Sequence, residues 1–136
     1  MSEHLDNIIT AIEMELGEGK VAIAAAPKNG GWTESTRDPR GQFNGYVVLY
    51  PGQGLFEGSL AQGDELINES IQIKCVGKTA EQALAIRDRV RSALRGLRAS
   101  TRSSALRLSV SRPVFRDDAT SPSVFYVDDI YDLFIA

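Results

Sequence analysis

Few residues in this chain are suited to acid–base, nucleophilic or metal chemistry. The 136 residues include one histidine, His4, and one cysteine, Cys75. His4 stands at the start of an expected helix, where chain ends fray, so it is a poor base for a serine or cysteine nucleophile. One histidine and one cysteine also cannot supply the four ligands of a zinc site. We therefore expect a protein that is not an enzyme and has no cofactor.

Carboxylates are another possible source of metal ligands. Asp117, Asp118, Asp128 and Asp129 lie close together in the sequence, and carboxylate oxygens bind hard cations such as Ca²⁺. Acids that flank a strand are more often ion-pair partners or solubility features, so we expect no metal site. Asp128 and Asp129 are instead candidate contacts to a partner or a neighbouring subunit.

Charge is segregated along the chain, although the net charge of −3 is unremarkable. Residues 1–19 carry five acids and no lysine or arginine, and residues 117–136 carry five aspartates and no base. Residues 87–116 carry nine arginines and one acid, Asp88. Such segregation favours docking to a partner or self-association over an isolated monomer.

The composition is that of an ordinary globular domain. With 43% hydrophobic and 24% charged residues, it excludes a disordered tail and a collagen-like repeat. No stretch approaches the roughly 20 apolar residues of a membrane span. A single cysteine cannot form an intrachain disulfide, which fits a reducing compartment. The opening MSEHLDN is acidic where an export signal is basic, so we expect no such signal.

Hydrophobic periodicity predicts one domain, 1–136, of the α/β (α+β) class, with a mainly antiparallel sheet packed by two helices in the order α-β-β-β-α-β-β. The helices are expected at 2–16 and 80–95, the second with a capping box of Thr79 and Gln82. Strands are expected at 20–26, 45–50, 66–76, 105–112 and 124–135, with polar connections at 99–104 and 116–123.

Alternation within the strands places several polar residues. In the third strand Cys75 falls in line with core isoleucines, where a free cysteine is an inert small hydrophobe. The fourth strand alternates cleanly, and Pro113 ends or bends it. In the last strand, Asp128 and Asp129 are expected to break the alternation as a bulge or a bend.

Residues 27–44 form a long polar loop with two large apolar side chains, Trp32 and Phe43. Structureless loops of that length are uncommon in compact domains and are usually functional or disordered, and both interpretations stay open here. A lone tryptophan on a polar loop is a common interface anchor. Trp32 is therefore a candidate contact residue, together with Arg37 and Arg40.

A ridge of four arginines lies along one side of the second helix, at spacings of four, four and three: Arg87, Arg91, Arg95 and Arg98. It is either a solvated face or a docking face. Solvated faces usually mix the two signs of charge, and here only Asp88 interrupts the ridge, so we favour docking.

The Arg-rich segment 87–116 also leaves a small nucleic-acid-binding module open, because arginines neutralise phosphates. Against that function, the pI is about 5.2, whereas most such domains are basic. Aromatic residues do not interleave with the arginines as base stacking requires. The same charges can pair with the acidic segments of a neighbouring copy, and a head-to-tail ring uses such unlike, complementary surfaces.

Three stretches follow one another along the chain: GYVVLYPGQG…EGSL, then IQIKCVGKTAEQALAIRDRVRSAL, then RDDATSPSVFYVDDIYDLF. Their order resembles the tail terminator proteins of long-tailed bacteriophages, especially those of actinobacterial hosts. The likeness covers most of the chain, and its pattern is strand, glycine turn, strand, Cys-Val-Gly and capped helix. No catalytic motif defines that family.

The resemblance implies a ring, usually of six subunits, that caps the head-proximal end of the tail tube and stops its polymerisation. It implies a virion location after assembly in the host cytoplasm. The implied partners are other copies of the chain, the tail tube protein and the head–tail connector or stopper protein. Genomic DNA would pass through the ring without sequence-specific binding, and no membrane is involved. Another neck or head–tail connector protein is the nearest alternative.

Within such a ring we expect Arg87, Arg91 and Arg95 to face acids on an adjacent subunit. Charge reversal at Arg91 is then expected to block ring formation while the monomer stays folded. The candidate contacts rest on charge and expected exposure, since the family provides no residues to carry over.

Overall fold

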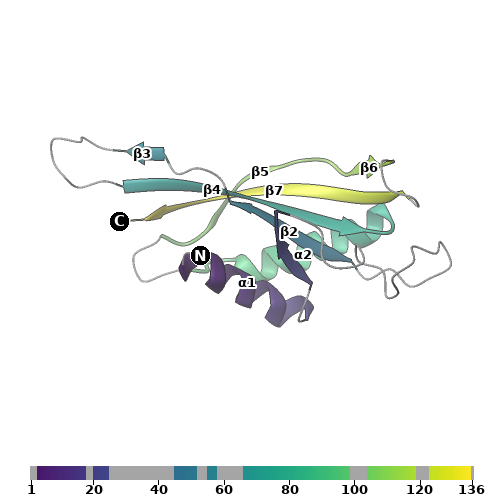
Figure 1. The fold of residues 1–136 in the computed structure, drawn as a ribbon, viewed down its shortest axis with the longest axis horizontal. Coiled ribbons are helices and arrows are strands. Elements are labelled where there is room, and N and C mark those ends of the chain that lie inside the picture. The colour runs from purple at the N-terminus through teal and green to yellow at the C-terminus, as the bar shows by residue number, and fades with distance from the viewer. Residues whose placement is uncertain are drawn as a thin grey trace.

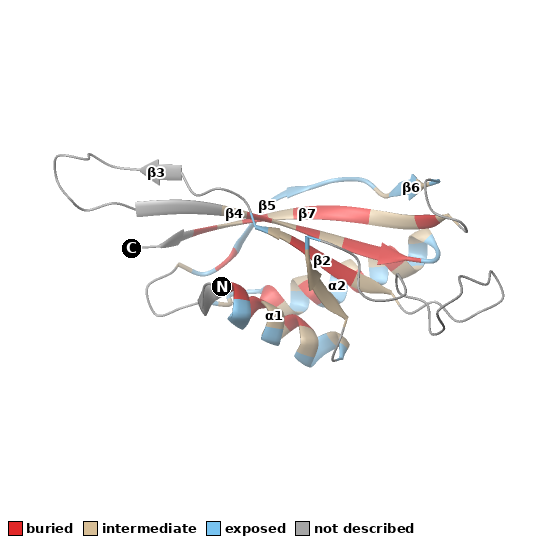
Figure 2. Ribbon diagram, viewed as in Figure 1, coloured by how far each residue is buried: buried red, intermediate tan, exposed pale blue. Residues whose placement is uncertain are grey.

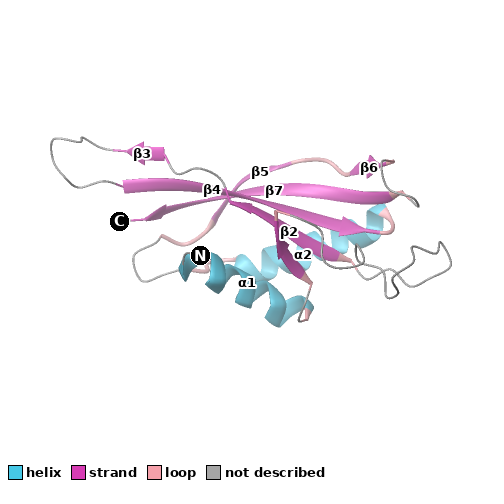
Figure 3. Cartoon of the chain, viewed as in Figure 1, coloured by secondary structure: helices cyan, strands magenta, loops and turns pink. Residues whose placement is uncertain are grey.

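The structure, a computed structural model, describes residues 3–17, 20–24, 45–51, 55–57, 66–98, 104–118 and 123–135. Its elements, in chain order, are α1 Glu3–Leu16, β1 Val21–Ile23, β2 Tyr46–Pro51, β3 Leu55–Glu57, β4 Leu66–Gly77, α2 Ala80–Leu94, β5 Arg107–Ser111, β6 Phe115–Asp117 and β7 Val124–Ile135 (Figure 1, Figure 3). The predicted order of helices and strands is confirmed. Two short strands, β3 and β6, add to it, and β6 includes the start of the connection predicted at 116–123. The loop predicted at 27–44 lies outside the described residues.

All the described strands belong to one sheet, in the order β1-β2-β4-β7-β5. β3 pairs with the first part of β4, and β6 pairs with the first part of β7. Of the pairings described, β1 with β2 is parallel and the rest are antiparallel. The prediction of a mainly antiparallel sheet is therefore confirmed, and β7 is a central strand.

The register of β7 corrects the prediction for Asp128 and Asp129. β4 and β7 pair without a shift through both aspartates, which stand opposite Lys74 and Ile73. The prediction of a bulge or a bend at this point is therefore wrong. The register shift lies instead in the neighbouring strand β5, next to Leu108. Because β7 keeps its alternation, consecutive aspartates point to opposite faces of the sheet.

Both helices lie on the same side of the sheet (Figure 1). α2 packs on β4 and β7, and α1 packs on α2 and β1. Ile8 and Ile12 of α1 are fully buried, as are Val90 and Leu94 of α2. Each buried side chain of this size stabilises the fold by about 1.5–3 kcal/mol. Neither of the two described helices is long and apolar enough to cross a membrane.

The start of α2 is fixed by a capping arrangement. The Gln82 amide N–H donates to the Thr79 hydroxyl oxygen at 3.1 Å, as the capping box predicts. The Gln82 side-chain oxygen accepts from the Lys78 N–H at 2.6 Å, one residue before the position expected for a standard box. These bonds satisfy donors that would otherwise lack partners at the helix end.

Candidate docking surface

The sole cysteine is buried against the helix layer. Cys75 belongs to the hydrophobic core, as predicted. Burial raises the pKa of its thiol far above the usual range, and the neighbouring Asp129 carboxylate raises it further. The thiolate, which is the reactive form, is therefore not populated at neutral pH. Cys75 acts as a packing residue.

A buried ion pair ties α2 to the middle of the sheet. The Arg91 guanidinium donates to both carboxylate oxygens of Asp129, with Nε 2.9 Å from Oδ2 and Nη2 3.1 Å from Oδ1. It also donates to the Ser111 hydroxyl of β5 at 2.6 Å. The hydrogen bond to Asp129 is the main reason why the pKa of Arg91 is raised. One side chain thus joins α2, β7 and β5.

The Asp129 carboxylate is buried more deeply than its partner Arg91. Its side chain is 2% exposed, whereas that of Arg91 is 29% exposed. The nearby Tyr131 hydroxyl is buried and has no hydrogen-bond partner. Burial raises the pKa of Tyr131, and the charge of Asp129 adds to this effect. The cluster therefore holds the Asp129 charge in a hydrogen-bonded ion pair at the centre of the sheet.

The arginine ridge is therefore divided. Arg91 is paired with Asp129 of its own chain, and a contact of the ridge with acids of an adjacent subunit stays a prediction. Arg87 contacts Asp88 on the same helix at 3.2 Å, and its Nε is buried without a partner. Arg95 and Arg98 are exposed at the end of α2 and beyond it. α2 packs on the sheet, so the side of the helix that carries Arg87 and Arg91 turns inward.

The two candidate aspartates are not free surface carboxylates. Asp128 and Asp129 are both buried, so the exposure expected of them is wrong. The reason is the place of β7 between β4 and β5 in the sheet, where Asp129 faces the helix layer and side chains of the neighbouring strands flank Asp128. Asp128 lies on the face away from the helices, opposite Lys74, and its Oδ1 is buried with no hydrogen-bond partner. The other three candidates, Trp32, Arg37 and Arg40, lie outside the described residues.

The remaining carboxylates near β7 behave as ion-pair partners. Asp118 accepts from the Arg116 guanidinium at 2.6 Å and from the Ser123 hydroxyl at 2.8 Å. No group of three or more His, Cys, Asp or Glu side chains capable of holding a metal ion occurs in the part of the chain that the structure describes.

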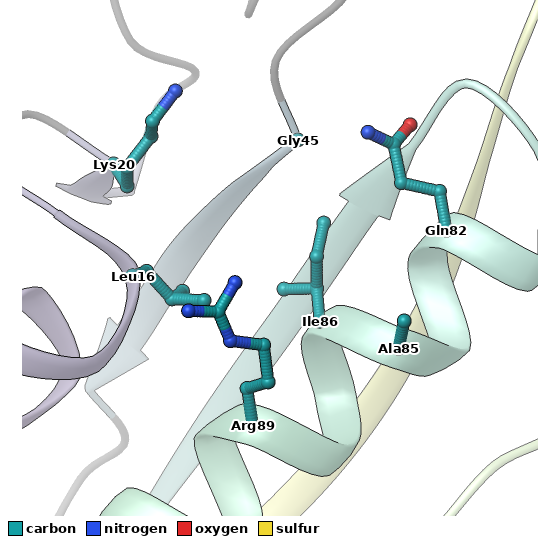
Figure 4. A pocket seen from close by; sticks show the side chains of 7 residues that line it. All are labelled: Leu16, Lys20, Gly45, Gln82, Ala85, Ile86 and Arg89. Atoms are coloured by element: carbon teal, nitrogen blue, oxygen red, sulfur yellow. The ribbon is translucent and has the colours of Figure 1, made fainter.

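A hollow of about 260 Å³ opens between the end of α1, the start of β2 and α2 (Figure 4). Ile86 points toward Gly45 across it, and Arg89 reaches toward Leu16. The Arg89 guanidinium is held there by the Glu15 carbonyl oxygen at 2.6 Å. Leu16, Ala85 and Ile86 give the hollow an apolar part, and Lys20 and Gln82 also line it.

The most exposed strand in the described part of the sheet is β5. It is the last strand in the order, and all five of its residues are exposed (Figure 2). Leu108 is 39% exposed and Val110 is 43% exposed. An edge strand presents unpaired backbone groups to solvent. In β5 the two apolar side chains alternate in sequence with Arg107, Ser109 and Ser111, and a register shift separates them.

The apolar surface continues onto β6. Phe115 is 46% exposed, and its ring stacks on that of Tyr126 with the ring centroids 5.8 Å apart. The Lys74 ammonium lies over the same tyrosine, 4.3 Å from the ring centroid. These contacts hold β6 on β7 and leave the outer side of Phe115 exposed.

We call this candidate docking surface the β5 patch and define it by Val110 with the exposed arginines Arg107 and Arg112 at its ends. The register places these three residues on the side of the sheet away from the helices, whereas Leu108 stands opposite Tyr131 and points to the helix side. The sequence prediction did not select it, because the alternation of the strand suggested one buried face. A signal was present in Pro113: proline next to a strand is typical of sheet edges.

Similarity to known proteins does not assign this surface a role. No protein-family model matches the chain, and no curated protein matches it. A function has to be argued from the fold, the charges and the β5 patch.

Proposed function

We propose that this protein is a structural virion protein that forms a ring on the head-proximal end of a phage tail tube. The ring ends polymerisation of the tube and joins the tail to the head connector. The proposal starts from the order of sequence stretches that resembles tail terminator proteins. It is supported by the segregation of acidic and basic segments, which suits contacts between unlike surfaces of identical copies.

The single observation that carries the proposal is the exposed apolar edge at β5. A bulge and charged side chains on an edge strand hinder open-ended pairing with other strands, and β5 has both, a register shift next to Leu108 and the charge of Arg107. Here Leu108 and Val110 are both exposed in the isolated chain. Covering them with a neighbour removes apolar surface from water, which is the dominant driving force of association.

The chemistry of the described residues favours binding over catalysis. The Cys75 thiol is buried and protonated, and Asp129 is engaged by Arg91. Catalytic sites combine a nucleophile or base with an accessible pocket. The reactive groups that the structure describes are placed as structural groups instead.

Two other functions remain as rivals. A sister neck protein would form rings with a similar surface and differ in its partner. A nucleic-acid-binding module would use the exposed arginines of the same region, such as Arg95, Arg98 and Arg107. Binding of that kind weakens steeply as salt rises, so salt dependence separates it from apolar assembly.

The test is negative-stain imaging of the purified protein over a concentration series, with DNA, with isolated tail tubes, and alone. Rings that seat on one end of the tubes and stop their growth support a terminator. Rings that ignore tubes but bind a head connector favour the sister neck protein. A protein that coats DNA and leaves it at high salt overturns the proposal.

A matched pair of variants asks whether the β5 patch drives assembly. Val110→Lys places a charge in the apolar edge and is expected to abolish rings. Ser92→Lys adds the same charge at an exposed position of α2 and is expected to leave them intact. Rings that survive Val110→Lys would remove the observation on which the proposal rests.

A further inference from the structure

The outer side of α1 presents an acidic stripe, which we define by Asp6, Thr10, Glu13 and Met14. Spacings of four, three and one residues place these side chains on one side of the helix, opposite the buried Ile8. α1 contains no lysine or arginine. Met14 is 84% exposed, so the stripe has an apolar group beside its carboxylates.

The acidic stripe and the β5 patch are complementary in charge and in apolar content. The β5 patch has Arg107 and Arg112 at its ends with the apolar side chain of Val110 between them. The Asp6-to-Glu13 distance along the helix is about 10 Å. β5 is about 16 Å long. The stripe therefore fits within the length of the strand, with a carboxylate within reach of each flexible arginine.

One copy of the chain cannot bring these two surfaces together. α1 packs on α2 and β1, at the first end of the sheet order, and β5 is the strand at the other end. In Figure 1 the outer helix lies along the bottom of the molecule and β5 along the top. A contact between them has to join two copies head to tail, which is the arrangement that closes into rings.

We propose that the acidic stripe of α1 in one copy covers the β5 patch of the next copy. The inference rests on the proposed ring and names the segments that meet in it. A helix laid over an edge strand is one of the ways in which proteins protect such an edge. The pairing of carboxylates with arginines sets the register, and burial of Met14 against Val110 supplies apolar contact.

Disulfide cross-linking between two variants, each with one cysteine added to the buried Cys75, tests the contact. Met14→Cys and Val110→Cys are prepared separately, oxidised alone, and then oxidised as a mixture, with and without tail tubes. Protein is taken up to about 1 mM, where even weak contacts associate. We expect a cross-linked dimer containing one copy of each variant, formed in the mixture and not by either variant alone.

Two controls and two alternative outcomes decide whether the acidic stripe contacts the β5 patch. The natural chain, with Cys75 buried, and Ser92→Cys mixed with Met14→Cys should give no cross-link. Dimers of Val110→Cys with itself would show edge-to-edge pairing of two β5 strands and overturn the proposal. Absence of any cross-link in the mixture would also overturn it.

A chain carrying both cysteines extends the test. Head-to-tail contacts predict a ladder of cross-linked species whose largest member is the closed ring. Tube capping by the natural protein is measured in parallel. Capping without the mixed cross-link refutes this contact and keeps the proposed function. The mixed cross-link without capping keeps the contact and refutes the function.

Discussion

Replacement of Arg91 gives the sharpest test of how the fold holds its buried charge. Arg91→Met keeps most of the apolar stem of the side chain and removes the guanidinium, which leaves the Asp129 carboxylate, 2% exposed, without its paired cation. Breaking a buried pair in this way costs about 3–5 kcal/mol. Because the arginine itself is partly exposed, water can reach the vacated side, and we expect the lower end, about 3 kcal/mol.

The opposite truncation is expected to cost less. Asp129→Leu leaves Arg91 without its carboxylate, but 29% of that side chain already contacts solvent and it keeps the Ser111 hydroxyl. We expect a loss of about 1–2 kcal/mol, between the values typical of exposed and buried pairs. The double variant replaces the pair by apolar groups and is expected to lie within about 1 kcal/mol of the natural protein.

The free energy of unfolding of all four proteins is measured by urea titration followed by far-ultraviolet circular dichroism. The slope of this free energy against urea concentration is compared among the variants to check for two-state behaviour. A coupling energy of about 3–5 kcal/mol in the double-mutant cycle is the expected result, because the two single costs together exceed the cost of the double variant by that amount. A cost below about 1 kcal/mol for Arg91→Met, additive with Asp129→Leu, would refute the reasoning. Such a result would mean that the Asp129 carboxylate is solvated in the variant in spite of its burial.

Charge reversal at Arg91 has one expected outcome from the sequence and a different one from the structure. The sequence predicts that Arg91→Glu blocks assembly of a folded monomer. In the structure the new carboxylate would face Asp129 across a buried contact, so the monomer itself should lose stability. Unfolding curves of the variant decide between the two, and a variant as stable as the natural chain would favour the sequence prediction.

Three further predictions concern stability. Gly77→Ala should lower the free energy of unfolding by about 1–3 kcal/mol, because its Cβ would lie 2.5 Å from the backbone nitrogen of Ala83; a stability unchanged in urea would contradict this. Thr79→Ala should cost about 1 kcal/mol by removing the hydroxyl that accepts from Gln82, and Thr79→Ser should restore most of it. Since burial raises the pKa of Cys75, only the unfolded thiol ionises above its ordinary pKa of about 8.5. The natural protein should therefore lose about 1.4 kcal/mol per pH unit above that value, and Cys75→Ala, measured over the same pH range, should lack this part of the loss.

The candidate site was less predictable than the elements that carry it. Arg91 was selected for its place on a helical ridge, yet its partner Asp129 stands 38 residues away on another element. Asp128 and Asp129 were selected as exposed because they are charged. Their burial depends on β7 lying between β4 and β5, and strand order leaves no local trace in the sequence.

Local sequence patterns alone were enough to predict the two helices, the long strands, the cap at Thr79 and the burial of Cys75. Each of these depends on neighbours within a few residues, so the spacing of apolar side chains is enough to predict it. Tertiary structure alone decided that Arg91 turns inward and that Leu108 and Val110 stay exposed. Those outcomes depend on which strand ends the sheet and which helix side meets it, and these are set by the summed burial of the whole core.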